Sequence, residues 1–397
     1  MTINTDPKKI NELLTRGVEN VFPSRDFLDA RLKEGKQLTL YIGIDPTGPS
    51  LHLGHANSLM KLAQFQELGH KVIMLIGSFT AMIGDPTDKM ATRKPLTREQ
   101  VMENCKKYKE QAGAILNFKG KNAAEIKFNH KWLDKLNFSE IISLAGNFTV
   151  QQMLERDMFE KRMNEGKPIG LHEFLYPLMQ GYDSVEMDVD GEIGGNDQTF
   201  NMLAGRTMMK NIKNKEKFVL TSKLLTDPTG KKMGKSEGNM VTLDDTADNK
   251  FGKVMSWSDE MIESAFELCT KESSEKLAEV KERLAKGENP RNLKLELAFS
   301  ITKLYHGEEK AKEAQENFVA MFSKKETPDE MVEMSLAGQT IVDALVNAKL
   351  VSSKGDAKRN IEQKGVKVNN DVVEDMNLVV KAGDIIQKGK RFFVKVK

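Results

Sequence analysis

Residues 40–55, LYIGIDPTGPSLHLGH, combine side chains that could hold a nucleoside triphosphate. Thr47, His52 and His55 can donate hydrogen bonds to phosphate oxygens, and Gly54 has no side chain to block a base or ribose. In a chain with six histidines, His-x-Gly-His arises by chance roughly once in a hundred. We therefore predict a nucleotide site here, with a capped helix carrying two surface histidines as the alternative.

The predicted elements place this segment at the end of a strand. The apolar run 38–44 favours a strand, residues 45–49 break it, and helical spacing runs from Leu51 to a stop at Gly69. Ligands of α/β sheets lie beyond the carboxyl ends of strands, where helix N-termini offer free N–H groups to phosphate. Further strands are predicted at 72–76, 126–128, 185–189 and 218–220. The expected fold class is therefore α/β.

Two further loops carry cations that could reach phosphate. Residues 230–239, GKKMGKSEGN, place Lys232 and Lys235 among glycines that allow a hinge, so both lysines could swing onto phosphates as charge develops. The spacing is not that of a P-loop. The other loop carries Lys89 and Arg93, for which a plain turn with surface charges is the alternative.

A pocket is predicted between these phosphate-directed stretches. Tyr176, Gln180 and Asp183 lie at i, i+4 and i+7, so they share one face of a helix among apolar side chains. An exposed polar stripe is the alternative. A glycine-rich turn then follows, in which Asp197 and Gln198 could accept hydrogen bonds from ribose hydroxyls or an amino group. Many turns of this composition are only turns, so this one does not establish a site by itself.

Composition indicates an ordinary soluble protein of two or three domains. The 397 residues are 39% hydrophobic and 30% charged, and no run approaches the ~20 apolar residues of a membrane-spanning helix. The polar N-terminus lacks both a signal-peptide core and a transit-peptide pattern, so we expect a cytoplasmic protein. Cys105 and Cys269 provide neither a disulfide framework nor metal-binding spacing.

The C-terminal sixty residues differ in charge from the rest of the chain. Residues 338–397 contain 12 Lys or Arg against 7 Asp or Glu, in a chain whose net charge is only +2. A helix from Ser353 carries Lys354, Lys358 and Arg359, and short strands follow it, which is typical of a binder of structured RNA. The alternative is a solvated tail of a lysine-rich protein.

Two helical stretches lie outside the predicted sheet. Residues 139–163 carry more apolar side chains than one core contact needs, which suggests a subunit interface. Residues 259–321 are predicted to be helical and highly charged.

Taken together, the two signatures resemble those of the bacterial tyrosyl-tRNA synthetases, class I enzymes marked by His-Ile-Gly-His and Lys-Met-Ser-Lys-Ser. The resemblance extends from about Val21 to a C-terminal segment that resembles an S4 RNA-binding domain. It implies an α/β fold with a Rossmann-like parallel-sheet catalytic domain, an α-helical domain on the anticodon side, a linker and a small α+β S4-like domain, with bounds at 1–245, 246–325, 326–337 and 338–397.

The same resemblance implies roles for individual residues. The phenol hydroxyl of tyrosine would be bound by Tyr41 and Asp183, supported by Asn129, and its ammonium group would be held by a second set: Asp85, Tyr176 and Gln180. The ATP and adenylate site would be lined by Gly43, Asp45, Gly54, Gly195, Asp197, Gln198 and Lys235. The catalytic set that stabilises pyrophosphate would comprise Thr47, His52, His55, Lys89, Arg93, Lys232 and Lys235.

The implied reaction joins tyrosine to ATP, with Mg²⁺ accompanying the ATP, and then transfers the tyrosyl group to tRNA(Tyr). The resemblance also implies a homodimer without membrane attachment and without a metal held by the protein. Three residues depart from the pattern: Leu53 replaces Ile, Gly234 replaces Ser, and Glu192 stands where a Gln is common.

Three alternatives compete with this interpretation. A tryptophanyl-tRNA synthetase shares the fold, but an indole would make poor use of Tyr41 and Asp183. A small adenylyltransferase carries His-x-Gly-His but needs neither the second lysine loop nor a basic C-terminal module. A non-catalytic RNA-binding paralogue would have lost its phosphate-contacting residues, which are present here.

Overall fold

The computed structural model describes residues 2–85, 95–230, 240–323, 332–348, 350–351, 353–389 and 392–397. The chain divides into two compact units, residues 1–315 and 316–397. Each unit has its own sheet and its own core. The bounds predicted above for a helical domain and a linker remain predictions.

The first unit is organised around a six-stranded sheet in the order β1-β6-β5-β2-β3-β4. Strands β2 to β6 pair in parallel, and β1 pairs antiparallel with β6 at one edge. Its interior strands are almost continuously buried, as a sheet covered on both faces requires. The bounds are β1 Val18–Phe22, β2 Thr39–Ile44, β3 Lys71–Ile76, β4 Glu125–Phe128, β5 Gly191–Gly195 and β6 Phe218–Ser222.

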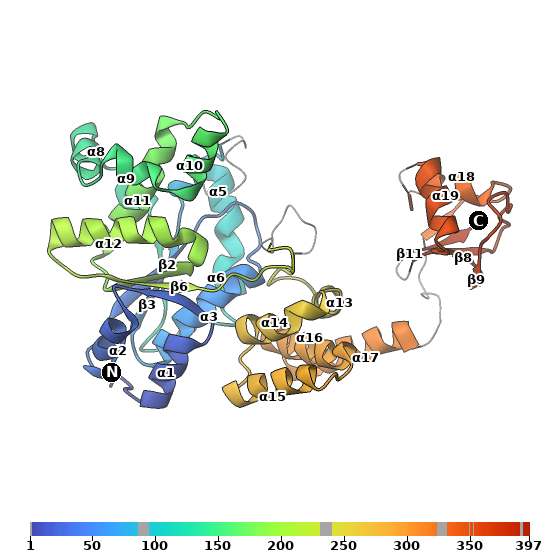
Figure 1. The fold of residues 1–397 in the computed structure, drawn as a ribbon, viewed down its shortest axis with the longest axis horizontal. Helices are drawn as coiled ribbons and strands as arrows, with labels where there is room; N and C mark the ends of the chain where they lie inside the picture. Colours follow the sequence, from blue (N-terminus) through green and yellow to red (C-terminus); the bar gives the residue numbers. More distant parts are fainter. Residues whose placement is uncertain are drawn as a thin grey trace. The chain divides into compact units, whose positions relative to one another are not determined.

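Helices cover both faces of this sheet (Figure 1). On one face lies α3 (Leu53–Glu67), which contacts β2, β3, β5 and β6; on the other lies α12 (Thr199–Lys213), packed along α11 (Leu171–Met187). α11 and α12 approach closely at Gly181, which has no side chain to hold them apart. A Cβ added there would lie 2.6 Å from Met208 Sδ and 3.3 Å from the Gly205 nitrogen.

Most predicted strands and helices are confirmed, with two corrections. The strand predicted at 185–189 is wrong: α11 continues to Met187, ends at Asp188 in the left-handed conformation, and β5 starts at Gly191. The polarity of residues 185–189 alternates as in a strand, and this local pattern gives no sign that Val185 packs on Met208 and Met209 of α12. The helical stretch 139–163 is three helices: α8 Phe138–Ala145, α9 Val150–Leu154 and α10 Asp157–Asn164.

The remaining helices of this unit either surround the sheet or belong to a helical group that follows β6 in the sequence. Around the sheet these are α1 Pro7–Thr15, α2 Arg25–Lys33, α4 Thr80–Ile83, α5 Arg98–Asn104, α6 Tyr108–Ala112 and α7 His130–Leu133. The helical group comprises α13 Ala247–Met255, α14 Ile262–Cys269, α15 Ser274–Ala285, α16 Pro290–His306 and α17 Glu308–Ser323, which crosses into the second unit. Arg16 connects the two groups by donating to the main-chain oxygens of Glu267 and Thr270 at the end of α14.

The second unit has a five-stranded sheet in the order β7-β11-β10-β8-β9 with two helices. Ile341, Leu345, Ile361, Val366 and Ile386 belong to its buried core. Its elements are β7 Val332–Met334, α18 Ile341–Asn347, α19 Lys354–Glu362, β8 Val366–Val368, β9 Asp371–Val372, β10 Ile385–Lys388 and β11 Phe392–Val396. None of the helices described in either unit is long and apolar enough to cross a membrane.

Candidate active site

The two signature histidines build the N-terminus of α3. The Nδ1 atom of His52 accepts from the Gly54 N–H at 3.1 Å, and the Nδ1 atom of His55 accepts from the His52 N–H at 3.2 Å, so the rings cap the helix reciprocally with centroids 3.9 Å apart. A Cβ at Gly54 would lie 2.9 Å from the His52 ring, which explains the glycine between them. Both histidines are partly exposed beyond the end of β2.

Residues 241–243 lie beside the N-terminus of α3. The Leu53 N–H donates to the Val241 oxygen at 3.1 Å, and the Leu243 N–H donates to the Leu51 oxygen at 2.8 Å. His52 and Thr242 form a β-bridge. Thr47 lies exposed in the turn after β2. The other residues predicted to contact pyrophosphate, Lys89, Arg93, Lys232 and Lys235, lie outside the described residues.

Asp183 is a buried carboxylate with two side-chain donors. Its Oδ1 accepts from Trp132 Nε1 at 2.8 Å, and its Oδ2 accepts from Asn129 Nδ2 at 3.2 Å. Burial raises the pKa of Asp183 well above its usual range, while these two hydrogen bonds act in the opposite direction. Asn129 was predicted at this site, whereas Trp132 was missed, because its proximity arises only from the packing of α7 against α11.

Tyr41 lies on β2 and is fully buried. Its hydroxyl is 2.9 Å from Ser184 Oγ and 3.5 Å from the main-chain oxygen of Gln180. Burial raises the pKa of Tyr41 well above its usual value, and the charges of Glu192 and Asp183 raise it further. The phenol therefore stays neutral and keeps a proton to donate.

Asp45 and Tyr176 meet where β2 ends. The Tyr176 hydroxyl donates to Asp45 Oδ2 at 2.9 Å, and Thr80 Oγ1 donates to Asp45 Oδ1 at 2.6 Å. Burial raises the pKa of Asp45 to about 7; the two hydrogen bonds lower it, and the charge of Asp85 raises it. Asp45 therefore changes charge near neutral pH. Tyr176 and Asp183 are both buried, so the alternative of an exposed stripe is wrong for them.

Asp85 connects three elements. It forms an ion pair with Arg156 at 2.8 Å, and its Oδ2 accepts from Gln198 Nε2 at 2.7 Å. Arg156 is nearly buried and was not predicted. Gln180 donates through Nε2 to Glu192 Oε1 at 2.9 Å. The structure therefore brings the predicted ammonium-binding residues to one region, together with partners that the sequence did not reveal.

The glycine-rich turn predicted at 192–198 is wrong in its first part: its glycines lie in β5 (Gly191–Gly195), and a 3₁₀ segment follows at Asn196–Gln198. A Cβ at Gly195 would lie 2.5 Å from Asp197 Oδ1, so the glycine allows the Asp197 carboxylate to fold over the strand end. Gly43 is exposed near the carboxyl end of β2. These residues border the same strand ends as Asp45, where an adenylate would lie.

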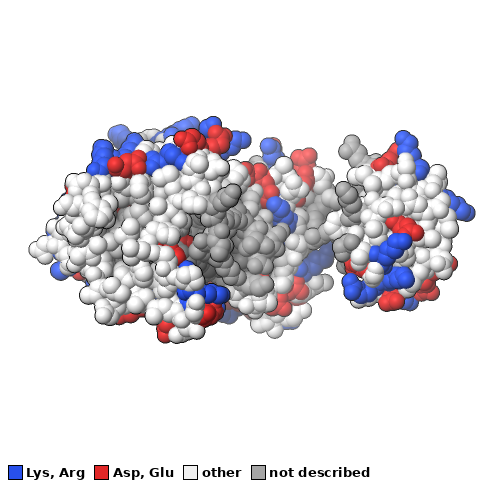
Figure 2. Space-filling view, turned by 90° about the horizontal axis from the view of Figure 1, so that it is seen from above, with Lys and Arg blue, Asp and Glu red and all other residues white. Residues whose placement is uncertain are grey.

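The predicted RNA-binding residues lie on α19 in the second unit. Lys354, Lys358 and Arg359 are exposed, but Lys354 pairs with Asp343 at 2.7 Å, and Arg359 lies 3.8 Å from Asp356. Figure 2 shows basic side chains interspersed with acidic ones on the visible face of this unit.

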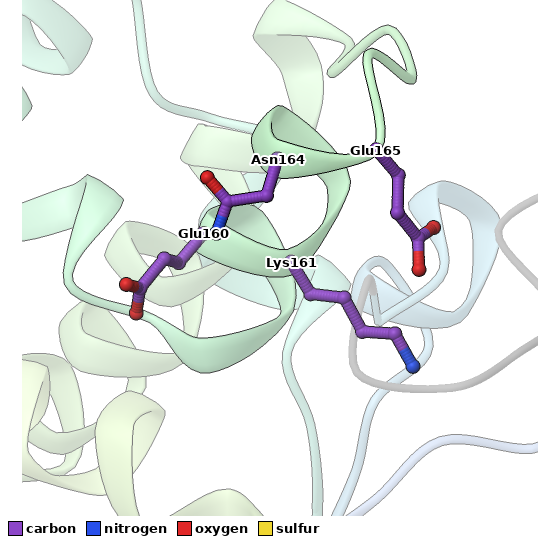
Figure 3. A pocket seen from close by; sticks show the side chains of 4 residues that line it. All are labelled: Glu160, Lys161, Asn164 and Glu165. Carbon is purple, nitrogen blue, oxygen red and sulfur yellow. The ribbon is translucent and has the colours of Figure 1, made fainter.

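A shallow depression on α10 is a poor candidate for a functional site. It is lined by Glu160, Lys161, Asn164 and Glu165, whose side chains diverge around the end of the helix instead of converging on a point (Figure 3). Among the described residues, no three His, Cys, Asp or Glu side chains cluster as a metal site would require. The chemistry therefore centres on the strand ends of the six-stranded sheet.

Comparisons with known proteins identify the family of the chain. Residues 33–323 match the family described as tRNA synthetases class I (W and Y), and residues 321–395 match the SYY-like C-terminal domain of tyrosine–tRNA ligases. The chain is 43% identical over 395 residues to the tyrosine–tRNA ligase of Thermotoga maritima, covering 98% of both chains. It is 44% identical over 386 residues to that of Photobacterium profundum, covering 96% of this chain and 97% of that one.

Solved structures show the same fold. A C-terminally truncated mitochondrial tyrosyl-tRNA synthetase of Coccidioides posadasii superposes with a TM-score of 0.64 at 26% identity, covering 78% of this chain and 91% of that one. An Archaeoglobus fulgidus tyrosyl-tRNA synthetase complexed with L-tyrosine gives a TM-score of 0.61 at 21% identity, covering 78% and 99%, and supports the fold alone.

The chain therefore belongs to the class I tRNA synthetases of the tryptophan and tyrosine group, enzymes that use ATP as a substrate. Within this group it belongs with the tyrosine–tRNA ligases, because its full-length relatives and its C-terminal domain are both of that kind. The expected resemblance, fold class and enzyme class are confirmed.

Proposed function

We propose that the chain forms tyrosyl-adenylate and pyrophosphate from tyrosine and ATP, and then transfers the tyrosyl group to the 3′-terminal adenosine of tRNA(Tyr). The observation that carries this proposal is the buried pair of Tyr41 and Asp183. A substrate hydroxyl would accept the Tyr41 proton and donate to a remaining acceptor site of Asp183, whereas a substrate without a hydroxyl would leave that proton and that site unused away from water. This arrangement favours tyrosine over phenylalanine.

The proposed roles follow the geometry. Tyr41 and Asp183 bind the phenol hydroxyl, and Asn129 holds the Asp183 carboxylate in place. The ammonium group of tyrosine binds among Asp85, Tyr176 and Gln180. The adenylate lies along the strand ends, bordered by Gly43, Asp45, Gly54, Gly195, Asp197 and Gln198.

The first step needs no general base. The ionised carboxylate of tyrosine attacks the α-phosphorus in line, a carboxylate–phosphorus bond forms, and the bond to the bridging oxygen of pyrophosphate breaks. Negative charge grows on the departing pyrophosphate, so the protein acts through positioning and electrostatic stabilisation. Donors are supplied by Thr47 in the turn after β2 and by His52 and His55 at the start of α3. We assign the same role to Lys89, Arg93, Lys232 and Lys235.

Mg²⁺ is proposed to arrive with ATP. The described residues offer no cluster that would hold the ion by itself, and Mg²⁺ commonly binds through substrate phosphates with few protein ligands. Bound there, it would neutralise phosphate charge. The cytoplasm is the proposed location, since both ATP and tRNA are available there.

A homodimer is also proposed, through the face formed by α8, α9 and α11. Four large apolar side chains on this face are more than half exposed: Phe138, Ile142, Val150 and Leu171. Figure 2 looks onto this side of the first unit and shows a broad area without charged side chains. Such a patch is typical of a subunit interface. Sedimentation of the wild type should give twice the chain mass, and the double variant Phe138→Glu/Leu171→Glu should give one chain mass.

The decisive assay for the proposed function is amino-acid-dependent exchange of pyrophosphate into ATP. Tyrosine should support exchange, while phenylalanine and tryptophan should not at equal concentration. Charging of tRNA(Tyr) should follow with the same preference. Exchange with tryptophan instead would assign the other specificity of the group, and no exchange with any of the three would contradict the proposal.

A further inference from the structure

A second charged cluster lies behind Tyr41, and the mechanism above does not use it. Lys217 immediately precedes β6, Glu192 lies on β5, and the two side chains form an ion pair that is essentially inaccessible to solvent. Glu192 is the residue that departs from the Gln common in the family. The structure supplies the partner for that extra charge, namely Lys217.

The contacts of Lys217 fix its protonation state. Its Nζ donates to Glu192 Oε2, to Ser184 Oγ at 2.8 Å and to the Met202 main-chain oxygen at 3.2 Å. Three acceptors use all three protons of an ammonium group, whereas a neutral amine has only two to donate. Burial lowers the pKa of Lys217, and the adjacent Glu192 carboxylate acts against that shift.

This ammonium group occupies one acceptor site of the Ser184 hydroxyl. Ser184 Oγ accepts from Lys217, and its own proton can be donated to the Tyr41 oxygen, which lies 2.9 Å away. Tyr41 then accepts from Ser184 and keeps its own proton for a further acceptor. Two groups of the protein compete for that proton. The Gln180 main-chain oxygen lies 3.5 Å away, a length at which hydrogen bonds are weak, and the Glu192 carboxylate also interacts with the Tyr41 hydroxyl.

The cluster reaches the other end of the amino-acid pocket as well. Glu192 Oε1 accepts from Gln180 Nε2 at 2.9 Å, so the same ion pair orients a residue assigned to the ammonium group. Burying two charges costs several kcal/mol per ion, so a buried ion pair is weak evidence for a purely stabilising role.

We propose that Lys217 and Glu192 are positioning residues for tyrosine recognition: Lys217, through Ser184, presents the Tyr41 proton to the substrate hydroxyl, and Glu192 orients Gln180. This inference rests on the proposed function. The hydrogen bonds then run in one direction, from Lys217 to Ser184, to Tyr41, to the substrate hydroxyl and finally to Asp183. A phenylalanine side chain cannot complete this chain, so the cluster acts on specificity.

The packing of α12 leaves room for the cluster. A Cβ at Gly205 would lie 2.5 Å from Lys217 Nζ and 2.9 Å from Ser184 Oγ. Only glycine at this position lets α12 cover the ion pair without displacing it. Gly205→Ala therefore perturbs the cluster without removing any of its polar groups.

Ser184→Ala is the primary test, because it cuts the link to Tyr41 and leaves the ion pair intact. We expect kcat/KM for tyrosine in pyrophosphate exchange to fall about tenfold, as for the loss of one hydrogen bond, with kcat/KM for phenylalanine and KM for ATP unchanged. The tyrosine-to-phenylalanine ratio is the readout, since a merely structural role would not change it.

The ion pair is tested by the neutral double variant Glu192→Gln/Lys217→Met, because removing one charge alone would leave the other buried and unpaired. It should lower the same ratio by a similar factor, and adding Ser184→Ala should lower it little further, since both changes break one chain of hydrogen bonds. Gly205→Ala should also lower the tyrosine-to-phenylalanine ratio.

Lys61→Met is the matched control. Lys61 is also a buried lysine, and it donates to the main-chain oxygens of Leu13 and Arg16, on the other side of the sheet. It should reduce thermal stability without changing the ratio. An unchanged ratio in both Ser184→Ala and the double variant would overturn the inference while leaving the proposed function intact. Absence of tyrosine-dependent exchange in the wild type would overturn both.

Discussion

The proposed phenol end and the proposed phosphate end of the site differ in how deeply their side chains are buried. At the phenol end, Tyr41 and Asp183 are buried and already hydrogen-bonded to neighbours. At the phosphate end, Thr47 is exposed and the two histidines of the signature are partly exposed. Buried groups make discrimination strong, because an unsatisfied partner is costly away from water. Groups near the surface can reorient as negative charge develops on the phosphates of ATP, and they can then release pyrophosphate.

This contrast predicts that substitutions at the two ends separate binding of tyrosine from the rate of the chemical step. The phosphate end should change kcat, and the phenol end should change the preference for tyrosine.

The largest effect is expected at Thr47. Thr47→Ala removes one donor for the pyrophosphate charge, so kcat for exchange should fall by roughly 100-fold, while KM for tyrosine stays close to that of the wild type. Thr47→Ser keeps the hydroxyl and should retain most of the activity. A change confined to KM would place Thr47 in ground-state binding instead.

Asp183→Asn should affect the opposite end. The amide preserves the shape but removes the charge that accepts from the phenol hydroxyl, so kcat/KM for tyrosine should fall by roughly 30-fold. KM for ATP should stay unchanged. Steady-state exchange measures kcat/KM for tyrosine at saturating ATP and KM for ATP at saturating tyrosine. A tyrosine preference equal to that of the wild type would show that Asp183 does not contact the hydroxyl.

Asp45 lies between the two ends and should give the site its pH dependence. Because burial raises its pKa to about 7, the carboxylate is protonated as the pH falls below 7. Asp45 accepts from Tyr176, a residue assigned to the substrate ammonium, so its negative charge favours that cation, and kcat/KM for tyrosine should fall about tenfold from pH 8 to pH 6. Asp45→Asn should be slow at both pH values and show a flat profile. A wild-type profile that is flat over this range would exclude this role.

The smallest effect is expected from the second unit. Lys358→Gln on α19 should leave pyrophosphate exchange unchanged, because that reaction involves no tRNA. For tRNA charging, it should reduce the slope of log(kcat/KM) against log[salt] by about one, as expected for the loss of one phosphate contact. An unchanged slope would indicate that this lysine does not contact RNA.

Local sequence patterns predicted the frame of the site well. The strand, turn and helix from residue 38 to Gly69 follow from apolar runs, Pro and Gly, and the shared face of Tyr176, Gln180 and Asp183 follows from helical spacing. These features depend on residues that are close together in the sequence, so the local sequence pattern predicts them.

The partners of those residues could not be read in the same way. Trp132, Arg156 and Lys217 contact the site only after α7, α10 and β6 have packed around it. The edge strand β1 was also missed, since its pairing with β6 joins residues two hundred positions apart. The one trace of the cluster behind Tyr41 was Glu192, an acidic residue in an otherwise apolar and glycine-rich strand.

The most direct test of the proposed division of the site is the ratio of kcat/KM for tyrosine to that for phenylalanine in pyrophosphate exchange, measured side by side for the wild type, Asp183→Asn and Thr47→Ala. We expect the ratio to fall sharply in Asp183→Asn and to stay at the wild-type value in Thr47→Ala, although the latter is the slower enzyme. Equal losses of the ratio in both variants would contradict the division between a selecting phenol end and a catalytic phosphate end.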